Sequence, residues 1–250
     1  MEETHSTKAI ILDRKPFKEC DTMVSVFCLD RGKLGLVARG AKKMSSKLAG
    51  HIEPVTLSNI MIARGRQYDY LAAAVNENSF INIKNDFNKI NAAGRAINIF
   101  KTLIKENEKD ENLFYLLCDF LNILNNPKRE TPPFAEAAEG GQNSKLFFSF
   151  FVLKLLAQLG YKPELYDCAV CKDKITPNNN KFDLTKGGVV CAACAGAGDL
   201  LTITDNCIKV LRIILNSDFN KLSRLKININ AKLEIEIKET ISSFYKYISA

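Results

Sequence analysis

The sequence predicts an α+β protein in which a small N-terminal β-barrel precedes an α-helical domain with an inserted four-cysteine module. Short strand-like segments fill the first third of the chain. The apolar spacing changes to that of helices after about Asn85, and two Cys-x-x-Cys pairs interrupt the helical part. We therefore expect the barrel at 1–80, the first helices at 81–164, the cysteine module at 165–198 and the last helices at 199–250.

Five short apolar or alternating segments account for the barrel. They are Lys8–Leu12, Thr22–Leu29, Leu34–Arg39, Val55–Ala63 and Tyr68–Val75. Two glycine-containing connections, Asp30-Arg31-Gly32-Lys33 and Arg64-Gly65-Arg66-Gln67, predict hairpin turns after the second and fourth strands. Five strands in so short a stretch indicate a closed or nearly closed barrel. The OB-fold is a common five-stranded solution, and an SH3-like barrel fits the same pattern.

Helical spacing accounts for the rest. The expected helices are Ile90–Ile104, Leu113–Leu124, Lys145–Leu159, Asp205–Asn216 and Lys232–Ile248. The third is apolar nearly all round, so we expect it at the centre of the helical domain, with Gly160 ending it. A polar loop containing Pro132-Pro133 and Gly140-Gly141 is expected before it.

Composition indicates an ordinary globular chain. Hydrophobic residues make up 46% and charged residues 25% of the sequence. The N-terminus does not read as a signal peptide, and no apolar run reaches the roughly 20 residues that a bilayer crossing needs. We therefore expect a cytoplasmic protein without a membrane partner. In that reducing compartment the eight cysteines favour metal binding over a disulfide framework.

Four of the cysteines form two Cys-x-x-Cys pairs, Cys168 with Cys171 and Cys191 with Cys194. Two such pairs on tight turns can present four thiolates tetrahedrally to one Zn²⁺. A site with four protein ligands has no open position for a substrate, so we predict a single structural zinc ion. A redox-active dithiol pair is the alternative. The other cysteines lie in or beside apolar segments and are expected in the core: Cys20, Cys28, Cys118 and Cys207.

Basic residues gather in the barrel segment, within a chain of net charge +7. Residues 31–52 contain six basic and no acidic side chains, and the second hairpin adds two more. Lysine and arginine replace condensed counterions on a phosphate backbone. Tyr68 and Tyr70, with Phe17 and Phe27 as further candidates, could stack on unpaired bases. A solvated charged rim would look similar, so the pattern indicates nucleic acid only as a class. The candidate contacts are Arg31, Lys33, Arg39, Lys42, Lys43, Lys47, Arg64 and Arg66.

Three segments, in their order and spacing, resemble the RecO family of bacterial DNA repair proteins. They are KAIILDRKPFKECDTMVSVFCLDRGKLGLVARGAKK, GHIEPVTLSNIMIARGRQYDYL and CAVCKDKITPNNNKFDLTKGGVVCAAC, the last after a helix that ends in LAQLGYKPEL. The resemblance covers essentially the whole chain. It implies an N-terminal OB-fold, a helical domain with a four-cysteine zinc module, and a DNA surface on the barrel. The implied zinc ligands are Cys168, Cys171, Cys191 and Cys194, and the implied DNA contacts include Arg31, Lys33, Arg39, Lys42, Lys43 and Lys47.

The same resemblance implies an activity and partners. It implies binding of single- and double-stranded DNA, annealing of complementary strands, and association with the nucleoid. The implied protein partners are RecR, the tail of single-stranded DNA-binding protein and, indirectly, the RecA recombinase. An acidic, apolar-ended tail would need an apolar cleft with a basic rim. Phe147–Lys154 has the ingredients, although its apolar residues are better explained as core.

The sequence thus predicts a non-catalytic recombination mediator in DNA repair. A nucleotide-binding loop of the Gly-x-x-x-x-Gly-Lys-Ser/Thr form is missing, which disfavours ATP-driven chemistry. The alternative is an RNA-binding or translation-associated OB-fold protein with a structural zinc ribbon. A zinc enzyme is a third class. His51-Ile52-Glu53 imitates the His-x-Glu of zinc deaminases, but the Pro-Cys-x-x-Cys that those enzymes also need is missing.

Overall fold

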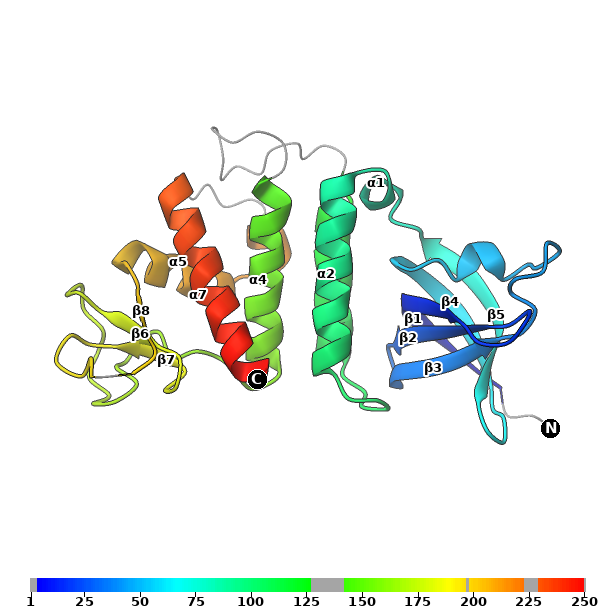
Figure 1. Ribbon diagram of the computed structural model, residues 1–250, viewed down its shortest axis with the longest axis horizontal. Coiled ribbons are helices and arrows are strands. Elements are labelled where there is room, and N and C mark those ends of the chain that lie inside the picture. Colours follow the sequence, from blue (N-terminus) through cyan, green and yellow to red (C-terminus); the bar gives the residue numbers. More distant parts are fainter. Residues whose placement is uncertain (1–3, 127–141, 197, 223–228, 250) are drawn as a thin grey trace. The chain divides into compact units, whose positions relative to one another are not determined.

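The computed structural model describes residues 4–126, 142–196, 198–222 and 229–249 (Figure 1). The chain divides into two compact units, Met1–Asn125 and Asn126–Ala250. The expected loop with Pro132-Pro133 and Gly140-Gly141 lies outside the described residues. The boundaries expected at 80, 164 and 198 stay a prediction. Among the described helices, none has the length and apolar character that a membrane crossing requires.

The first unit contains a closed five-stranded barrel, as the alternating segments predict. Its strands follow the order β1-β2-β3-β5-β4 around the barrel. Neighbouring strands are antiparallel except β3 and β5, which are parallel and pair only at Leu36 with Asp69 and Val37 with Tyr70. Both predicted hairpins are confirmed. The bounds are β1 Thr4–Pro16, β2 Thr22–Cys28, β3 Gly32–Ala38, β4 Thr56–Ala63 and β5 Asp69–Asn78.

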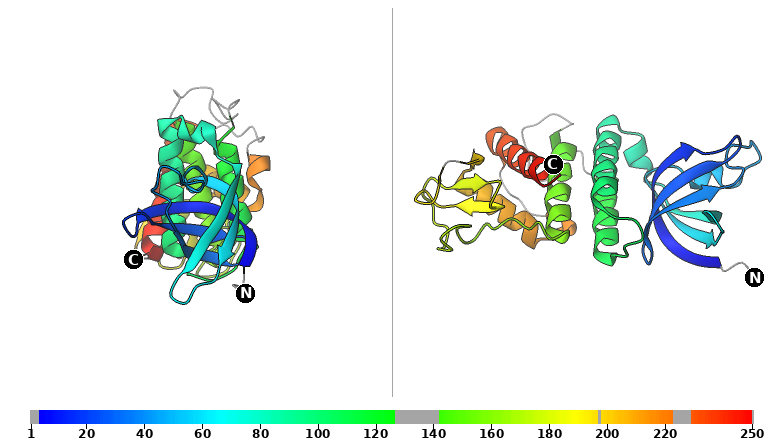
Figure 2. Two further views of the ribbon diagram at one scale, coloured as in Figure 1. Left: turned by 90° about the vertical axis from the view of Figure 1, so that its right-hand side faces the viewer. Right: turned by 60° about the horizontal axis from the view of Figure 1, so that its bottom comes forward.

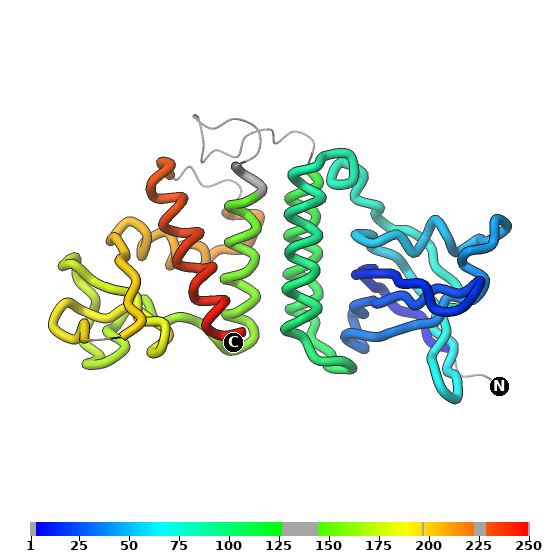
Figure 3. The backbone as a smooth tube through the Cα atoms, in the orientation of Figure 1, coloured from blue at the N-terminus to red at the C-terminus, as the bar shows by residue number. Residues whose placement is uncertain are grey.

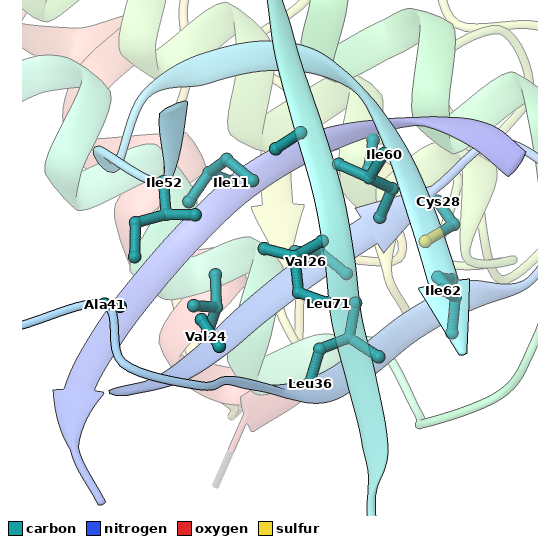
Figure 4. Packing of buried hydrophobic residues seen from close by; sticks show 13 residues of the cluster. Ile11, Val24, Val26, Cys28, Leu36, Ala41, Ile52, Ile60, Ile62 and Leu71 are labelled. Atoms are coloured by element: carbon teal, nitrogen blue, oxygen red, sulfur yellow. The ribbon is translucent and has the colours of Figure 1, made fainter. Parts of the chain in front are cut away.

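Strand alternation fills the barrel with aliphatic side chains. On β2, Val24, Val26 and Cys28 point inward, into one buried cluster with Ile11 of β1 and Leu71 of β5 (Figure 4). Fully burying such a side chain stabilises the fold by about 1.5–3 kcal/mol. The interior is therefore a packed core. Its remaining members are Ala9, Leu36, Ala38, Ala41, Ile52, Ile60, Ile62 and Ala74.

On the outward side of β2, Phe27 is also buried, because helices of the same unit cover it. The Phe27 ring lies edge-on to that of Phe100, with centroids 4.9 Å apart, and stacks on that of Phe114 at 6.4 Å. These two phenylalanines belong to α2 (Phe87–Leu103) and α3 (Glu111–Leu124), which follow the short helix α1 (Ile81–Lys84). Phe27 is 0% exposed. The prediction that Phe27 could stack on a base is therefore wrong.

The connection between α2 and α3 is fastened to the β2–β3 hairpin. The Lys33 ammonium donates to the carbonyl oxygens of Lys101, at 3.0 Å, and Ile104, at 2.5 Å. These carbonyls are at the C-terminal end of α2, where a cation is favoured. Gly32 has a φ of 69°, and a Cβ there would lie 2.1 Å from the Glu108 carbonyl oxygen. Only glycine fits at this contact.

The second unit is built around α4 (Gln142–Gln158), which packs against α5 (Asp205–Asn216) and α7 (Ala231–Ser249). This confirms the prediction of a central helix. Gly160 follows α4 with a φ of 93°, as its helix-ending role requires. A short helix, α6 (Phe219–Leu222), follows α5. The chain leaves the end of α4, forms the cysteine module and returns to α5 (Figure 3).

Candidate metal centre and nucleic-acid interface

A small three-stranded sheet supports the cysteine module. Its strands are β6 (Lys181–Asp183), β7 (Gly188–Val190) and β8 (Leu200–Thr202), in the order β7-β6-β8 (Figure 2). Three-residue strands such as β6 and β8 carry too little periodicity to be predicted from the sequence. Each strand is short, so the sheet offers little apolar surface of its own.

The sheet and the turns bring the two Cys-x-x-Cys pairs together. The sulfur atoms of all four cysteines lie within 4.8 Å of one another, and those of Cys171 and Cys191 are 3.9 Å apart. A zinc ion held at about 2.3 Å by four sulfurs in a tetrahedron separates them by about 3.8 Å. The predicted ligands, Cys168 and Cys194 included, therefore converge as a tetrahedral site requires.

Backbone hydrogen bonds set the two turns. The N–H of Lys172 donates to the carbonyl of Cys168 at 3.0 Å, with Lys172 in the left-handed region at a φ of 66°. The N–H of Cys194 donates to the carbonyl of Cys191, also at 3.0 Å. A further N–H, that of Ala169, donates to Val189 of the small sheet at 2.9 Å. Each turn thereby presents its two thiols on the same side.

The thiols differ in their tendency to ionise. Burial opposes ionisation of Cys168, but N–H groups of Cys191, Val170 and Cys171 outweigh it and lower its pKa to about 6. At Cys171 the N–H of Asp173 favours the thiolate. Burial and hydrogen bonds with the Cys168, Asp173 and Cys194 side chains together outweigh it and raise the pKa of Cys171 to about 12. Four adjacent thiolates need a cation, and this donor set suits a soft divalent metal.

The remaining cysteines show the contrast. Burial raises the pKa of Cys28, Cys118 and Cys207 to about 12 in each case. All three are buried, as predicted, and Cys20 is half-buried. Inert thiols of this kind are core residues.

The module is anchored to helices α5 and α7. Phe182 of β6 contacts Phe244 of α7 edge-on, with centroids 5.4 Å apart. Arg212 of α5 donates from Nε to the Leu165 carbonyl at 3.0 Å and lies 4.6 Å from the centre of the Tyr166 ring. The module is thus held at its base, while Cys171 is exposed.

In the first unit, the basic residues expected to bind nucleic acid lie on the connections of the barrel. Arg31 is exposed in the β2–β3 turn. Arg39 follows β3, and its guanidinium carbon lies 3.9 Å from the centre of the Tyr70 ring. The other exposed ones are Lys42, Lys43 and Lys47 after β3, and Arg64 and Arg66 in the β4–β5 hairpin. The half-buried Lys33 differs, because its ammonium is engaged by α2.

Contacts join three connections of the barrel into one surface: the β1–β2 connection, the segment after β3 and the β4–β5 hairpin. The Lys42 ammonium donates to the Lys18 carbonyl at 2.8 Å, which ties the β3 connection to the one between β1 and β2. Phe17 in turn contacts Tyr68 of the β4–β5 hairpin, with ring centroids 5.2 Å apart. We call the surface made of Lys18, Arg39, Lys42, Lys43, Lys47 and Arg66 the basic face.

The sequence-based prediction missed Lys18. Its ammonium lies 5.6 Å from the centre of the Phe17 ring, and the side chain is exposed. Its position after Pro16-Phe17, in a connection between two strands, was the available signal. Only the contact between Lys42 and Lys18 places it beside the other lysines.

Comparisons with known proteins agree with this architecture. The family described as "Recombination protein O N terminal" matches residues 1–80, and "Recombination protein O C terminal" matches residues 84–248. A "DNA repair protein RecO" of Dehalococcoides mccartyi is 32% identical over 237 residues, covering 94% of this chain and 88% of that protein. One of Desulforamulus reducens is 29% identical over 240 residues, covering 96% and 87%. One of Thermoanaerobacter is 27% identical over 241 residues, covering 96% and 90%. The chain therefore belongs to the RecO family of DNA repair proteins.

Proposed function

We propose that this protein is a non-catalytic recombination mediator that binds single- and double-stranded DNA through the basic face. It anneals complementary strands and helps to load RecA onto coated single strands, together with RecR. The observation that carries the proposal is the basic face itself, in which three barrel connections that carry lysines and arginines are joined by contacts. Surfaces of this kind bind phosphates without reading sequence.

The barrel has the properties of an OB-fold, which we propose it to be. Its five strands close in the order β1-β2-β3-β5-β4. OB-folds bind oligonucleotides through the connections between β1 and β2 and between β4 and β5. Lys18 lies in the first connection and Arg66 in the second. We keep 1–80 as the DNA-binding domain, followed by helices at 81–164, the cysteine module at 165–198 and helices at 199–250.

We propose one structural Zn²⁺ at the four cysteines. The convergence of the sulfur atoms within 4.8 Å supports it, and so does the anchoring of the module to two helices. Zinc at such a site supplies folding free energy and takes no part in chemistry.

A groove between α5 and α7 suits the acidic tail of single-stranded DNA-binding protein. It has a volume of about 420 Å³, and its apolar lining is Val210, Ile213 and Leu233. Lys209 and Lys232 also line it, and the carboxylate in the lining, that of Glu236, accepts a hydrogen bond from the Thr204 hydroxyl. The two lysines give charge complementarity to an acidic peptide with an apolar end. The earlier candidate, Phe147–Lys154, contributes mostly buried side chains to the core of this unit, as expected.

An annealing assay tests the proposed function. Complementary strands coated with single-stranded DNA-binding protein are mixed with wild-type protein or with the Lys42→Glu/Lys43→Glu variant. We expect the variant to anneal at least about tenfold more slowly, because two phosphate contacts are replaced by repulsion. The matched control is Lys174→Glu/Lys186→Glu, which makes the same charge change at exposed lysines of the cysteine module.

The outcomes separate the candidate functions. If the wild-type protein fails to anneal coated strands but binds RNA more tightly than DNA, the alternative of an RNA-binding protein replaces the mediator. If the control variant loses annealing while Lys42→Glu/Lys43→Glu keeps it, the DNA surface is on the second unit. Thermal unfolding of each variant shows whether its fold is intact.

A further inference from the structure

A polar pocket of about 280 Å³ opens beside the β4–β5 hairpin of the first unit. Its walls are residues 33–35 of β3, residues 65–69 of the hairpin, and Glu106 and Asn107 of the α2–α3 connection. The pocket exists because β3 and β5 pair only from Leu36 onward. Before Leu36, the edge of β3 faces a loop instead of a strand.

One aromatic residue, Tyr68, is among those that line this pocket. Of the aromatic residues that the sequence offers for stacking, Phe27 is buried in the unit and Tyr70 carries the Arg39 guanidinium on its ring. Tyr68 lines the pocket and is 36% exposed. Its ring meets that of Phe17 at 76°, an edge contact that fixes the ring without stacking on it.

We propose that this pocket takes one unpaired nucleobase, stacked on Tyr68, and gives the protein a preference for single strands over duplexes. The proposal rests on the DNA binding proposed above. Stacking on an aromatic side chain needs an exposed base face, which a base inside a duplex does not offer. The basic face would hold the backbone of either form.

The charges of the pocket favour a base over a phosphate. Asp69 and Glu106 carry carboxylates, and Gln67 and Asn107 carry amides. Lys33 also lines the pocket, but carbonyls of Lys101 and Ile104 bind its ammonium. Carboxylates repel phosphates but accept hydrogen bonds from the amino groups of bases. Arg66, also in the lining, is the residue placed to meet the adjoining phosphate.

The walls of the pocket are held in place before any ligand arrives. The Asn107 N–H donates to the Lys33 carbonyl at 3.0 Å, and Lys33 and Glu106 form an isolated parallel bridge. At the hairpin, a Cβ on Gly65 would lie 2.1 Å from the Tyr68 carbonyl oxygen and 2.6 Å from a ring carbon of Tyr70. A rigid pocket loses little conformational entropy on binding.

Equilibrium binding of fluorescent oligonucleotides tests this pocket. The probes are a mixed-sequence single strand, the same strand with every base removed, and the corresponding duplex. We expect Tyr68→Ala to lower the affinity for the normal single strand about 5- to 150-fold, the range that loss of one stacked base gives. Duplex affinity should fall by less than threefold, from loss of the Phe17 contact alone, and the salt dependence of single-strand binding should not change. Tyr68→Phe keeps the ring and should bind like wild type, and Tyr161→Ala, which removes a tyrosine 51% exposed in the second unit, is the matched control.

The probe without bases provides the decisive comparison. Wild-type protein should bind it more weakly than the normal strand, and Tyr68→Ala should lower affinity for it by less than threefold. Equal wild-type affinity for the two strands, or an equal loss for single strand and duplex in Tyr68→Ala, overturns the base pocket while DNA binding stands. A wild-type protein that binds none of the probes overturns the proposed function instead.

Discussion

The barrel and the cysteine module solve the same problem, holding irregular connections in place, by different physical means. The barrel surrounds a core of 13 residues, and its basic connections extend from that core. The module has strands of only three residues and offers four converging thiols instead. We therefore expect the barrel fold to tolerate changes on most of its surface, and the module fold to depend on its four thiols.

The largest expected effect concerns the module. Removing the proposed zinc by chelation, or changing Cys194 to Ser, should unfold residues 165–203 locally, because a four-thiolate zinc site contributes on the order of 10 kcal/mol to folding. Hydrogen exchange measured by mass spectrometry should show faster exchange there and unchanged exchange in the barrel strands. Cys20→Ser is the control. If metal-free protein kept native protection from hydrogen exchange at residues 165–203, the module would not depend on a metal for its fold.

The next effect concerns the barrel, at a position where a connection between strands tolerates only glycine. Gly32→Ala should cost about 3 kcal/mol of unfolding free energy, because it strains a positive φ and forces Cβ against the Glu108 carbonyl. Gly94→Ala is the control. Nothing lies within 4 Å of a Cβ at that helical position, so stability should rise by about 0.5–1 kcal/mol. Urea denaturation measures both changes, and equal midpoints would refute the close contact.

A pair of lysines separates stability from DNA binding. Lys33→Met should cost about 1–2 kcal/mol of stability, because two carbonyls of α2 lose their charged donor. It should leave the salt dependence of DNA affinity unchanged. Lys43→Met should do the reverse, with intact stability and a slope lower by about 0.7 for single strands. If both lysines alter the slope and neither alters stability, the capping role of Lys33 is wrong.

The smallest effect is electrostatic. Burial opposes ionisation of Asp13, but its hydrogen bonds with Lys101 and the Arg14 N–H outweigh it and lower its pKa. A depressed pKa stabilises the fold above the unfolded value of about 3.9, and this stabilisation is lost as the pH falls below it. Asp13→Asn should therefore cost up to about 1 kcal/mol at pH 7 and less at pH 3, since the pair is partly exposed. A difference from wild type that grows on acidification would contradict this.

The spacing of apolar residues predicted the long, regular strands and helices. The five barrel strands, their hairpins and the five long helices follow from spacing, and α5 has the predicted bounds Asp205–Asn216. β1 is longer than its apolar part, Lys8–Leu12, because pairing with β2 and β4 extends it over polar residues. Apolar spacing carries no information about such extensions.

Site residues were likewise predicted correctly where local spacing identifies them and incorrectly where distant partners decide their role. The four cysteines were found because their spacing reflects the geometry of one tetrahedron. Phe27 and Lys33 were read as surface residues because their partners, Phe100 of α2 and the carbonyls at its end, are about seventy residues away along the chain. Long-range packing of this kind is invisible to local patterns.

The packing of Phe27 has a consequence for synthesis. The barrel strands are complete when β5 ends, but α3, which supplies Phe114, ends at Leu124. At about 5–20 residues per second, the ribosome needs about 2 to 9 s to make that difference. During this interval the nascent barrel displays an aromatic ring that the finished protein hides. We expect this period to be when the chain is most prone to aggregation, and slow translation between β5 and α3 to prolong it.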